Sequence, residues 1–144
     1  MDKFKVLEHV LVEDYEKVPV ELWADQEFVF HAIHWNGFNF RFANENLRKD
    51  KKFVTKVIKY WGYAFKYAHS DLQKDKEFIL QLINYNSCIL NYVDQSLKID
   101  KEFILQVLQA CNHAFEYVDE KLKNDQDILL KIKFTKKFKF YSLK

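Results

Sequence analysis

Hydrophobic and polar positions follow one pattern that recurs every 25 residues along most of the chain. In each repeat a leucine is followed three residues later by an aspartate. Apolar residues then occupy one helical face, as Phe28, Val29 and Ala32 do. The leucines are Leu22, Leu47, Leu72, Leu97 and Leu122, and the aspartates are Asp25, Asp50, Asp75, Asp100 and Asp125. This regular period, without insertions, predicts an array of similar structural units.

Each repeat predicts two short helices. The aspartate is a good N-cap, because its carboxylate accepts hydrogen bonds from the free N–H groups of the first turn. The first helix should run about 12 residues, or roughly 18 Å. Gly37 and Gly62 occupy the position where a residue in the left-handed conformation commonly ends a helix. A shorter second helix should follow, with Phe40, Ala43 and Leu47 at helical spacing.

The predicted fold class is all-α: a right-handed array of four to five 25-residue helix-turn-helix repeats, forming a short α-solenoid with atypical terminal caps. A helical hairpin of this size cannot bury its apolar face alone, whereas stacked neighbours can. We therefore expect a single helical-repeat domain over 1–144. Its parts are an N-terminal cap at 1–21, repeats at 22–46, 47–71, 72–96 and 97–121, and a partial repeat with a basic C-terminal tail at 122–144.

Both ends depart from the pattern. At the N-terminus, Phe4 and Leu7 are slipped by one position against the first-helix pattern, which is typical of a degenerate cap. At the C-terminus, Lys133 and Lys136 fall at core positions, and apolar residues alternate with lysines at period two. The tail is therefore interpreted as a strand, an extended arm or a frayed cap, and the sequence does not decide among them.

The segment DKKFVTKVIKYWGYAFKYAHSDL at 50–72 and the two copies of DKEFIL, beginning at Asp75 and Asp100, share one unit pattern. This pattern resembles the repeat of the domain of unknown function 4116 family, over about Leu22 to Leu130. The resemblance implies a tandem helical array and brings no activity, cofactor or catalytic residue. The third and fourth repeats depart from the family pattern because they lack its glycine.

Composition narrows the class of protein. With only 2 Gly and 1 Pro, a turn-rich β-sandwich is disfavoured, and 49% hydrophobic residues argue against disorder. Cys88 and Cys111 form no C-x-x-C pair, which is typical of a reducing compartment. No apolar run reaches the ~18 residues of a membrane span, and the N-terminus is too charged for a signal peptide. We expect a cytoplasmic protein without membrane contact.

Motifs of catalysis are missing from the sequence. There is no glycine-rich phosphate loop and no G-x-S-x-G elbow. His31 and His34 lie near Glu27 on one predicted helix, but the equivalent positions in other repeats hold Lys, Gln or Asn, which indicates an exposed polar face. Cys111 lies near His113 without an activating acid. We expect no enzyme, no cofactor and no metal site.

Charge and aromatic residues indicate where a partner would bind. Lysines cluster in the second repeat and in the tail, and an aromatic residue recurs late in the first helix of three repeats. Lysine clusters are usually solvated faces, and aromatic stripes are usually core, so both interpretations stay open. The candidate partner-binding residues are Trp35, Tyr60, Tyr85, His31, His34, Lys52, Lys56, Lys59, Lys66, Lys131, Lys133, Lys137 and Lys139.

Two functions are compatible with these features. The first is a non-catalytic protein–protein interaction module, with one specific form being a stoichiometric inhibitor of a host effector, such as an anti-CRISPR protein acting on a nucleoprotein. The alternative is a nucleic-acid-binding protein that uses the basic second repeat and the Lys/Phe tail. A formal net charge of only +2 favours the first. The oligomeric state is not predicted.

Overall fold

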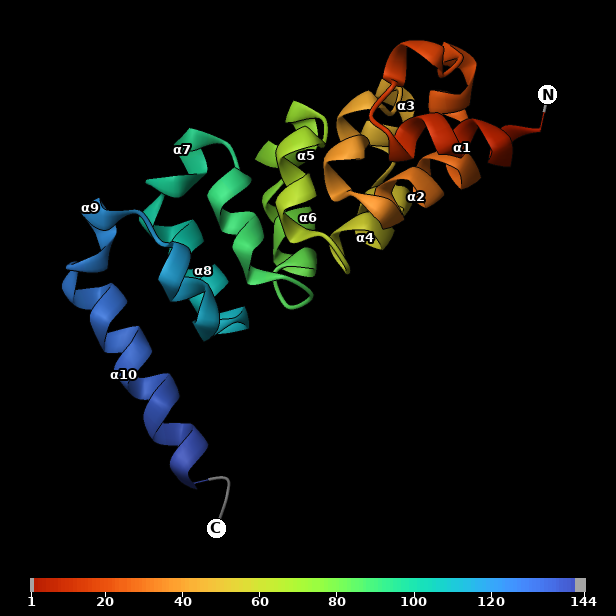
Figure 1. Cartoon of the computed structure of the whole chain (residues 1–144). Coiled ribbons are helices and arrows are strands. Elements are labelled where there is room, and N and C mark those ends of the chain that lie inside the picture. The colour runs from red at the N-terminus through yellow and green to blue at the C-terminus, as the bar shows by residue number, and fades with distance from the viewer. Residues whose placement is uncertain (1, 142–144) are drawn as a thin grey trace. The chain divides into compact units, whose positions relative to one another are not determined.

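The computed structural model describes the backbone of residues 2–141 and the side chains of residues 2–134. Every regular element in this part of the chain is an α-helix or a 3-10 helix, and no strand occurs there (Figure 1). The predicted all-α class is therefore confirmed.

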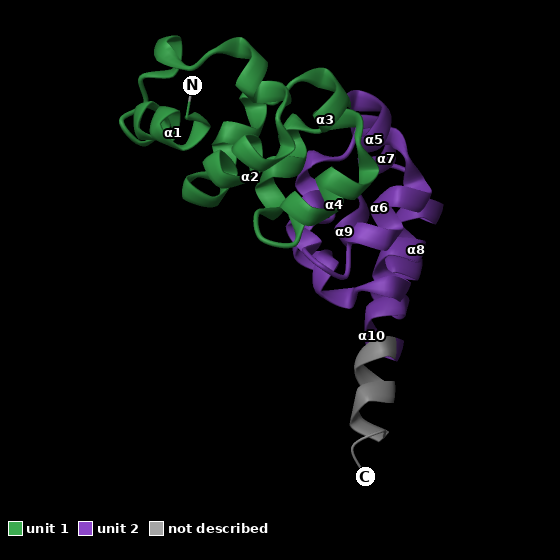
Figure 2. Ribbon diagram, turned by 90° about the vertical axis from the view of Figure 1, so that its right-hand side faces the viewer, with its two compact units in different colours: residues 1–69 green, residues 70–144 purple. Residues whose placement is uncertain are grey.

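The chain divides into two compact units, residues 1–69 and 70–144 (Figure 2). Unit 1 contains α1 (Lys3–Leu11), η1 (Tyr15–Lys17), η2 (Val20–Ala24), α2 (Gln26–Trp35), η3 (Gly37–Phe42), α3 (Glu45–Lys49), α4 (Lys51–Ile58) and η4 (Gly62–Tyr67). Unit 2 contains α5 (Ser70–Lys74), α6 (Lys76–Leu82), η5 (Ser87–Tyr92), α7 (Gln95–Lys98), α8 (Lys101–Ala110), η6 (Asn112–Tyr117), α9 (Glu120–Lys123) and α10 (Gln126–Tyr141).

The repeat contains three helical segments, so the prediction of two helices was wrong. A first helix of 7 to 10 residues is followed by a 3-10 helix and then by a short α-helix. The break falls where Ala43, Ala68, Val93 and Val118 leave the helical conformation. These small or β-branched side chains are all buried. The backbone of these four residues is extended, so the 3-10 helix and the short α-helix are separate segments.

The aspartates cap the first helices, as predicted. Asp25, Asp50, Asp75 and Asp100 each accept a hydrogen bond from the N–H three residues later, at 2.8, 2.9, 2.9 and 3.0 Å. Asp2 caps α1 by accepting from the N–H of Phe4 at 3.0 Å, so the N-terminal segment begins like a repeat. The short α3 helix has its own cap, Asn44, which accepts from the N–H of Leu47 at 3.0 Å.

The core of each unit consists of the same positions in successive repeats. Phe28 and Phe53 are buried in unit 1, as Phe78 and Phe103 are in unit 2. Fully burying one such side chain contributes about 1.5–3 kcal/mol. Isolated helices of 7 to 10 residues are marginal in water. Packing between neighbouring repeats must therefore supply most of the stability of each helix.

Two kinds of hydrogen bond join consecutive repeats within a unit. A main-chain N–H donates to a main-chain carbonyl 21 residues earlier: Asn44 to Trp23 at 2.8 Å, His69 to Arg48 at 2.9 Å and Asp94 to Gln73 at 2.9 Å. In addition, the lysine that begins one first helix pairs with the N-cap aspartate of the next, as Lys76 does with Asp100 at 2.6 Å. The DK dipeptide of the repeat thus serves two successive helices.

The two glycines do not adopt the left-handed conformation that was predicted for them, because neither has a positive φ. Gly37 instead lies so close to the second repeat that a larger side chain would not fit there. A Cβ atom there would lie 2.7 Å from the hydroxyl of Tyr63 and 3.0 Å from Cβ of Trp61. Close packing between the first and second repeats, not backbone conformation, accounts for glycine at this position.

The C-terminal segment is helical, so its interpretation as a strand or extended arm was wrong. The backbone of α10 continues as a helix to Tyr141, with Asp125 accepting from the N–H groups of Asp127 and Ile128 near its start. A lone strand would leave its backbone groups without partners, whereas a helix satisfies them within the segment. Lys133 is exposed at a position that is apolar in the interior repeats.

Two substitutions of Asp100 should separate its role as the N-cap of α8 from its ion pair with Lys76. Asp100→Ala loses both the cap and the Lys76 pair and should cost about 1–2 kcal/mol in the free energy of unfolding. Asp100→Asn keeps a capping side chain, so it should cost less than about 1 kcal/mol. Chemical denaturation measures both, with the exposed Glu116→Ala as control. Equal losses for the two Asp100 variants would contradict the dual role.

The same variants predict a pH dependence. Lys76, and then the N–H of Phe103, hold the pKa of Asp100 below its usual value. The stability that this shift contributes is therefore present above the unfolded pKa of about 4 and is lost as pH falls through the lower folded pKa. The stability difference between the native protein and Asp100→Asn should shrink on acidification through that range.

Candidate functional site

The predicted binding residues are distributed over both units. In unit 1, His31, His34 and Trp35 lie on α2, Lys52 and Lys56 on α4, Lys59 and Tyr60 just after α4, and Lys66 in η4. In unit 2, Tyr85 follows α6, and Lys131 and Lys133 lie on α10. The side chains of Lys137 and Lys139 lie outside the described residues.

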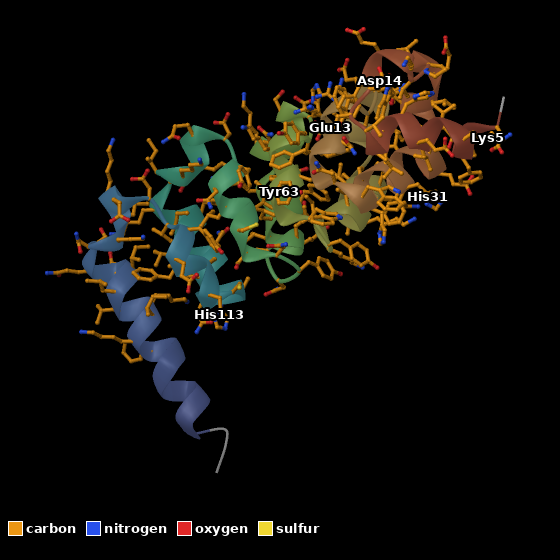
Figure 3. All side chains as sticks on the ribbon, viewed as in Figure 1. Lys5, Glu13, Asp14, His31, Tyr63 and His113 are labelled. Atoms are coloured by element: carbon orange, nitrogen blue, oxygen red, sulfur yellow. The ribbon has the colours of Figure 1, made fainter. Side chains whose placement is uncertain are left out.

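A groove between α2 and α4 brings three of these residues together. Its volume is about 480 Å³, and it is lined by Gln26, Glu27, Phe30, His31, Asp50, Lys52, Phe53 and Lys56. His31 projects from α2, as labelled in Figure 3. Sequence analysis singled out His31, Lys52 and Lys56 but gave Gln26, Phe30 and Asp50 no part in a site.

Aromatic rings organise the side chains around this groove. The ammonium of Lys56 lies 3.7 Å from the centroid of the Phe30 ring, which is a cation–π contact. Tyr60 meets the Phe30 ring edge-on at 6.5 Å, and His31 meets the ring of Phe4 edge-on at 5.4 Å. Lys56 is thereby positioned over an apolar surface.

Glu27 of the groove is already paired. Lys3, from α1, contacts the carboxylate of Glu27 at 2.5 Å and that of Asp25 at 3.1 Å. Hydrogen bonds from Lys3 to Glu27 and then to Asp25 raise the pKa of Lys3. The N–H of Phe28, and then Lys3, lower the pKa of Asp25. Lys3 therefore pairs with two acids of the next repeat within unit 1, and one of them, Glu27, lines the groove.

The recurring aromatic position late in the first helix is exposed. Trp35 is 62% exposed, Tyr60 67% and Tyr85 52%, whereas Ile33 and Ile58, two residues before the first two of these, are at most 1% exposed. The interpretation of this stripe as core was therefore wrong. Large aromatic side chains with this much exposure are suited to contact a partner.

A second group of aromatic rings, which sequence analysis missed, surrounds Gly37. Phe38 is 47% exposed, and its ring lies 4.8 Å from that of Tyr63 and 6.2 Å from that of Tyr67. Trp61 packs edge-on against Tyr63 at 5.9 Å. The signal was present in the sequence: these aromatics cluster on either side of the two glycines.

A smaller cavity of about 240 Å³ lies beside Trp35 and includes Tyr15 and Asn39. Asn39 is buried, and its amide is satisfied at both ends. It donates to the carbonyl of Ala32 at 2.8 Å and accepts from the hydroxyl of Tyr15 at 3.0 Å. Burial raises the pKa of Tyr15. These bonds account for one polar residue in an apolar core, so Asn39 is structural.

Among the side chains that the structure describes, no group of three or more His, Cys, Asp or Glu is placed to hold a metal ion. Burial raises the pKa of the Cys88 thiol, which disfavours the reactive thiolate. None of the described helices is long and apolar enough to cross a membrane.

Comparison with known families identifies the repeat. The family described as Domain of unknown function (DUF4116) matches residues 50–98 and 100–138. The chain belongs to this family. Both DUF4116 matches begin at an N-cap aspartate, Asp50 or Asp100, so the match follows the structural repeat. The DUF4116 segments include α4 but not α2, so only one wall of the groove lies within them. No curated protein and no solved structure matches the chain.

The exposure of Trp35 can be checked by fluorescence in this DUF4116 protein. Trp23 is buried, Trp61 is half-buried and Trp35 is exposed. Trp35→Phe should remove the emission that acrylamide quenches most readily and shift the remaining spectrum to shorter wavelength. The control is Trp61→Phe, which should change quenching less. An unchanged quenching slope in Trp35→Phe would contradict the exposed position.

Proposed function

We propose that the chain is a non-catalytic protein–protein interaction module, with its binding face on α2, on α4 and on the residues just after α4 in unit 1. The observation that supports this most strongly is the exposure of Trp35 and Tyr60, at 62% and 67%. Trp and Tyr are the residues that most often anchor protein interfaces. Exposing them costs a protein solubility, so their recurrence on a well-packed scaffold favours a binding role.

Charge around the face favours a protein over a nucleic acid. Lys52 and Lys56 line the groove, but so do the carboxylates of Glu27 and Asp50. Closely spaced phosphates would meet these acids, whereas a protein surface can place single charges opposite each group. The nucleic-acid alternative depends on the lysines alone and is the weaker proposal.

We also propose that the repeats form a short right-handed α-solenoid, which would present such a face along stacked helices. The contacts that recur within each unit support it. The main-chain bonds Asn44–Trp23 and His69–Arg48 in unit 1 and Asp94–Gln73 in unit 2 join equivalent positions of successive repeats. Recurring joints of one kind are typical of solenoids.

Small-angle X-ray scattering checks the solenoid. A globular domain of 144 residues has a radius of gyration of about 14 to 15 Å. The chain as a monomer should exceed this value, with a distance distribution extended to long distances, because stacked repeats lengthen in one direction. A radius of gyration at the globular value would contradict the solenoid.

Photo-crosslinking followed by affinity measurement tests the interaction function. Benzoylphenylalanine placed at Tyr60 should crosslink a discrete host protein, whereas the same group at Val20, exposed by 74% on the same unit, should not. With that protein purified, Trp35→Ala/Tyr60→Ala should weaken binding about tenfold or more, because anchor residues often contribute over 1.4 kcal/mol each.

Val20→Ala serves as the matched control and should leave the affinity unchanged. Equal crosslinking from both positions, or an unchanged dissociation constant in the double variant, would reject the face. The form of the function as a host-effector inhibitor, such as an anti-CRISPR protein, and the cytoplasmic location stay predictions.

A further inference from the structure

Successive repeats are tied by a lysine that binds one or two acids of the next repeat. Lys3 contacts Asp25 at 3.1 Å and Glu27 at 2.5 Å. Lys101 makes the same pair of contacts, with Asp125 at 3.0 Å and Asp127 at 2.5 Å. The acceptors are thus the N-cap aspartate and the acid two residues after it. We call this arrangement the lysine tie.

The lysine tie is missing between α2 and α4, where both the donor lysine and the second acid are replaced by other residues. Gln26 stands where the donor lysine is expected, and Lys52 stands where the second acid is expected. Within the described part of the chain, neither Asp50 nor Lys52 takes part in an ion pair. Asp50 keeps only its cap, accepting from the N–H of Phe53 at 2.9 Å. Gln26 cannot form the ion pair that a lysine forms at the other ties, and Lys52 carries the opposite charge to the acid it replaces.

The groove of unit 1 opens where the tie is missing. Gln26, Asp50 and Lys52, which occupy the three positions of the tie, all line it. Its other walls include the rings of Phe30 and Phe53. The three positions at which the tie is changed therefore all lie in the lining of the groove.

The charges in the groove leave a place for one anion. Glu27 is neutralised by Lys3, and Asp50 is directed to its own helix N-terminus. Lys52 is left without an acid, and the ammonium of Lys56 is held over Phe30 at 3.7 Å. A carboxylate beside Lys52 would restore the pairing that Glu27 and Asp127 provide at the other ties, and the Phe30 ring would contact its methylene groups.

We propose that this groove binds an acidic side chain, Asp or Glu, within an apolar segment of a partner protein. The inference rests on the proposed interaction function and specifies the chemistry of the partner. The carboxylate class follows from the other ties, in which lysine binds carboxylates. A phosphate chain is disfavoured because Asp50 and Glu27 line the same groove.

Restoring the tie should close the site. The double variant Gln26→Lys/Lys52→Glu recreates the residues of the other repeats at this interface. The probe is a fluorescein-labelled 12-residue peptide rich in Glu and Leu, whose binding is followed by fluorescence anisotropy at several salt concentrations. The native chain should bind it with a salt-sensitive affinity. The double variant should bind at least tenfold more weakly, with an equal or higher melting temperature.

Lys121→Gln is the matched control, because it lowers the net charge by one, as the double variant does, at an exposed position of unit 2. It should bind the peptide as the native chain does. In NMR titrations of the native chain, the backbone signals of His31, Lys52 and Lys56 should shift with the peptide. The double variant should lose these shifts.

Several results would overturn the proposal. They are equal peptide affinity in the double variant, no peptide binding by the native chain, or a double variant that is less stable than the native chain. The proposal would also fail if a labelled 12-nucleotide single-stranded DNA bound the groove more tightly than the peptide does. The ligand group would then be a phosphate and not a carboxylate.

The test separates this inference from the proposed function. If the crosslinked partner binds the double variant normally but loses affinity for Trp35→Ala/Tyr60→Ala, the interaction face stands and the groove inference fails. If the peptide binds through the groove while Trp35→Ala/Tyr60→Ala leaves the partner's affinity unchanged, the groove stands and the proposed face fails.

Discussion

The aspartate that begins each first helix makes the contact on which the rest of the structure depends. Its carboxylate satisfies a free N–H of its own helix and, where the lysine tie is present, receives the ammonium of the preceding repeat. A single side chain therefore determines both where a helix starts and where its neighbour lies. First helices of 7 to 10 residues need this, because they are too short to persist without a neighbour.

The sequence predicted the parts of the fold that depend on period and on capping chemistry. Phe28, Phe53 and their equivalents were placed in the core correctly, because burial follows a 3.6-residue spacing. The 3-10 segments were not predicted, because Phe40, Ala43 and Leu47 also have the spacing of one face of a continuous α-helix. The period-two pattern of α10 gave the wrong structure, because no neighbouring strand exists in the described backbone to make that pattern useful.

The candidate site was predicted only in part. The lysine excess of the second repeat drew attention to Lys52 and Lys56, and Lys52 was visibly the wrong charge for a helix N-terminus. Gln26 was not recognised, because a polar, uncharged residue is common at the start of a helix. The position of Gln26 matters because the equivalent Lys76 pairs with Asp100, which lies 24 residues later in the next repeat. A contact between residues so far apart in the sequence cannot be recognised before the structure is known. Asn39 was missed likewise, since its two hydrogen-bond partners lie 7 and 24 residues distant.

The main-chain bonds between repeats have a consequence for how such a chain can diverge. The bond from Asn44 to Trp23 and the bond from His69 to Arg48 involve no side-chain atom. The side chains at these four positions are of four different types, so substitution there can change the side chain without removing the main-chain hydrogen bond. A change in the number of residues between donor and acceptor has the opposite effect, because it displaces one partner from the other. The scaffold should therefore tolerate changes of residue type at these positions but not changes in the number of residues between them. The gain or loss of a whole repeat would preserve that number.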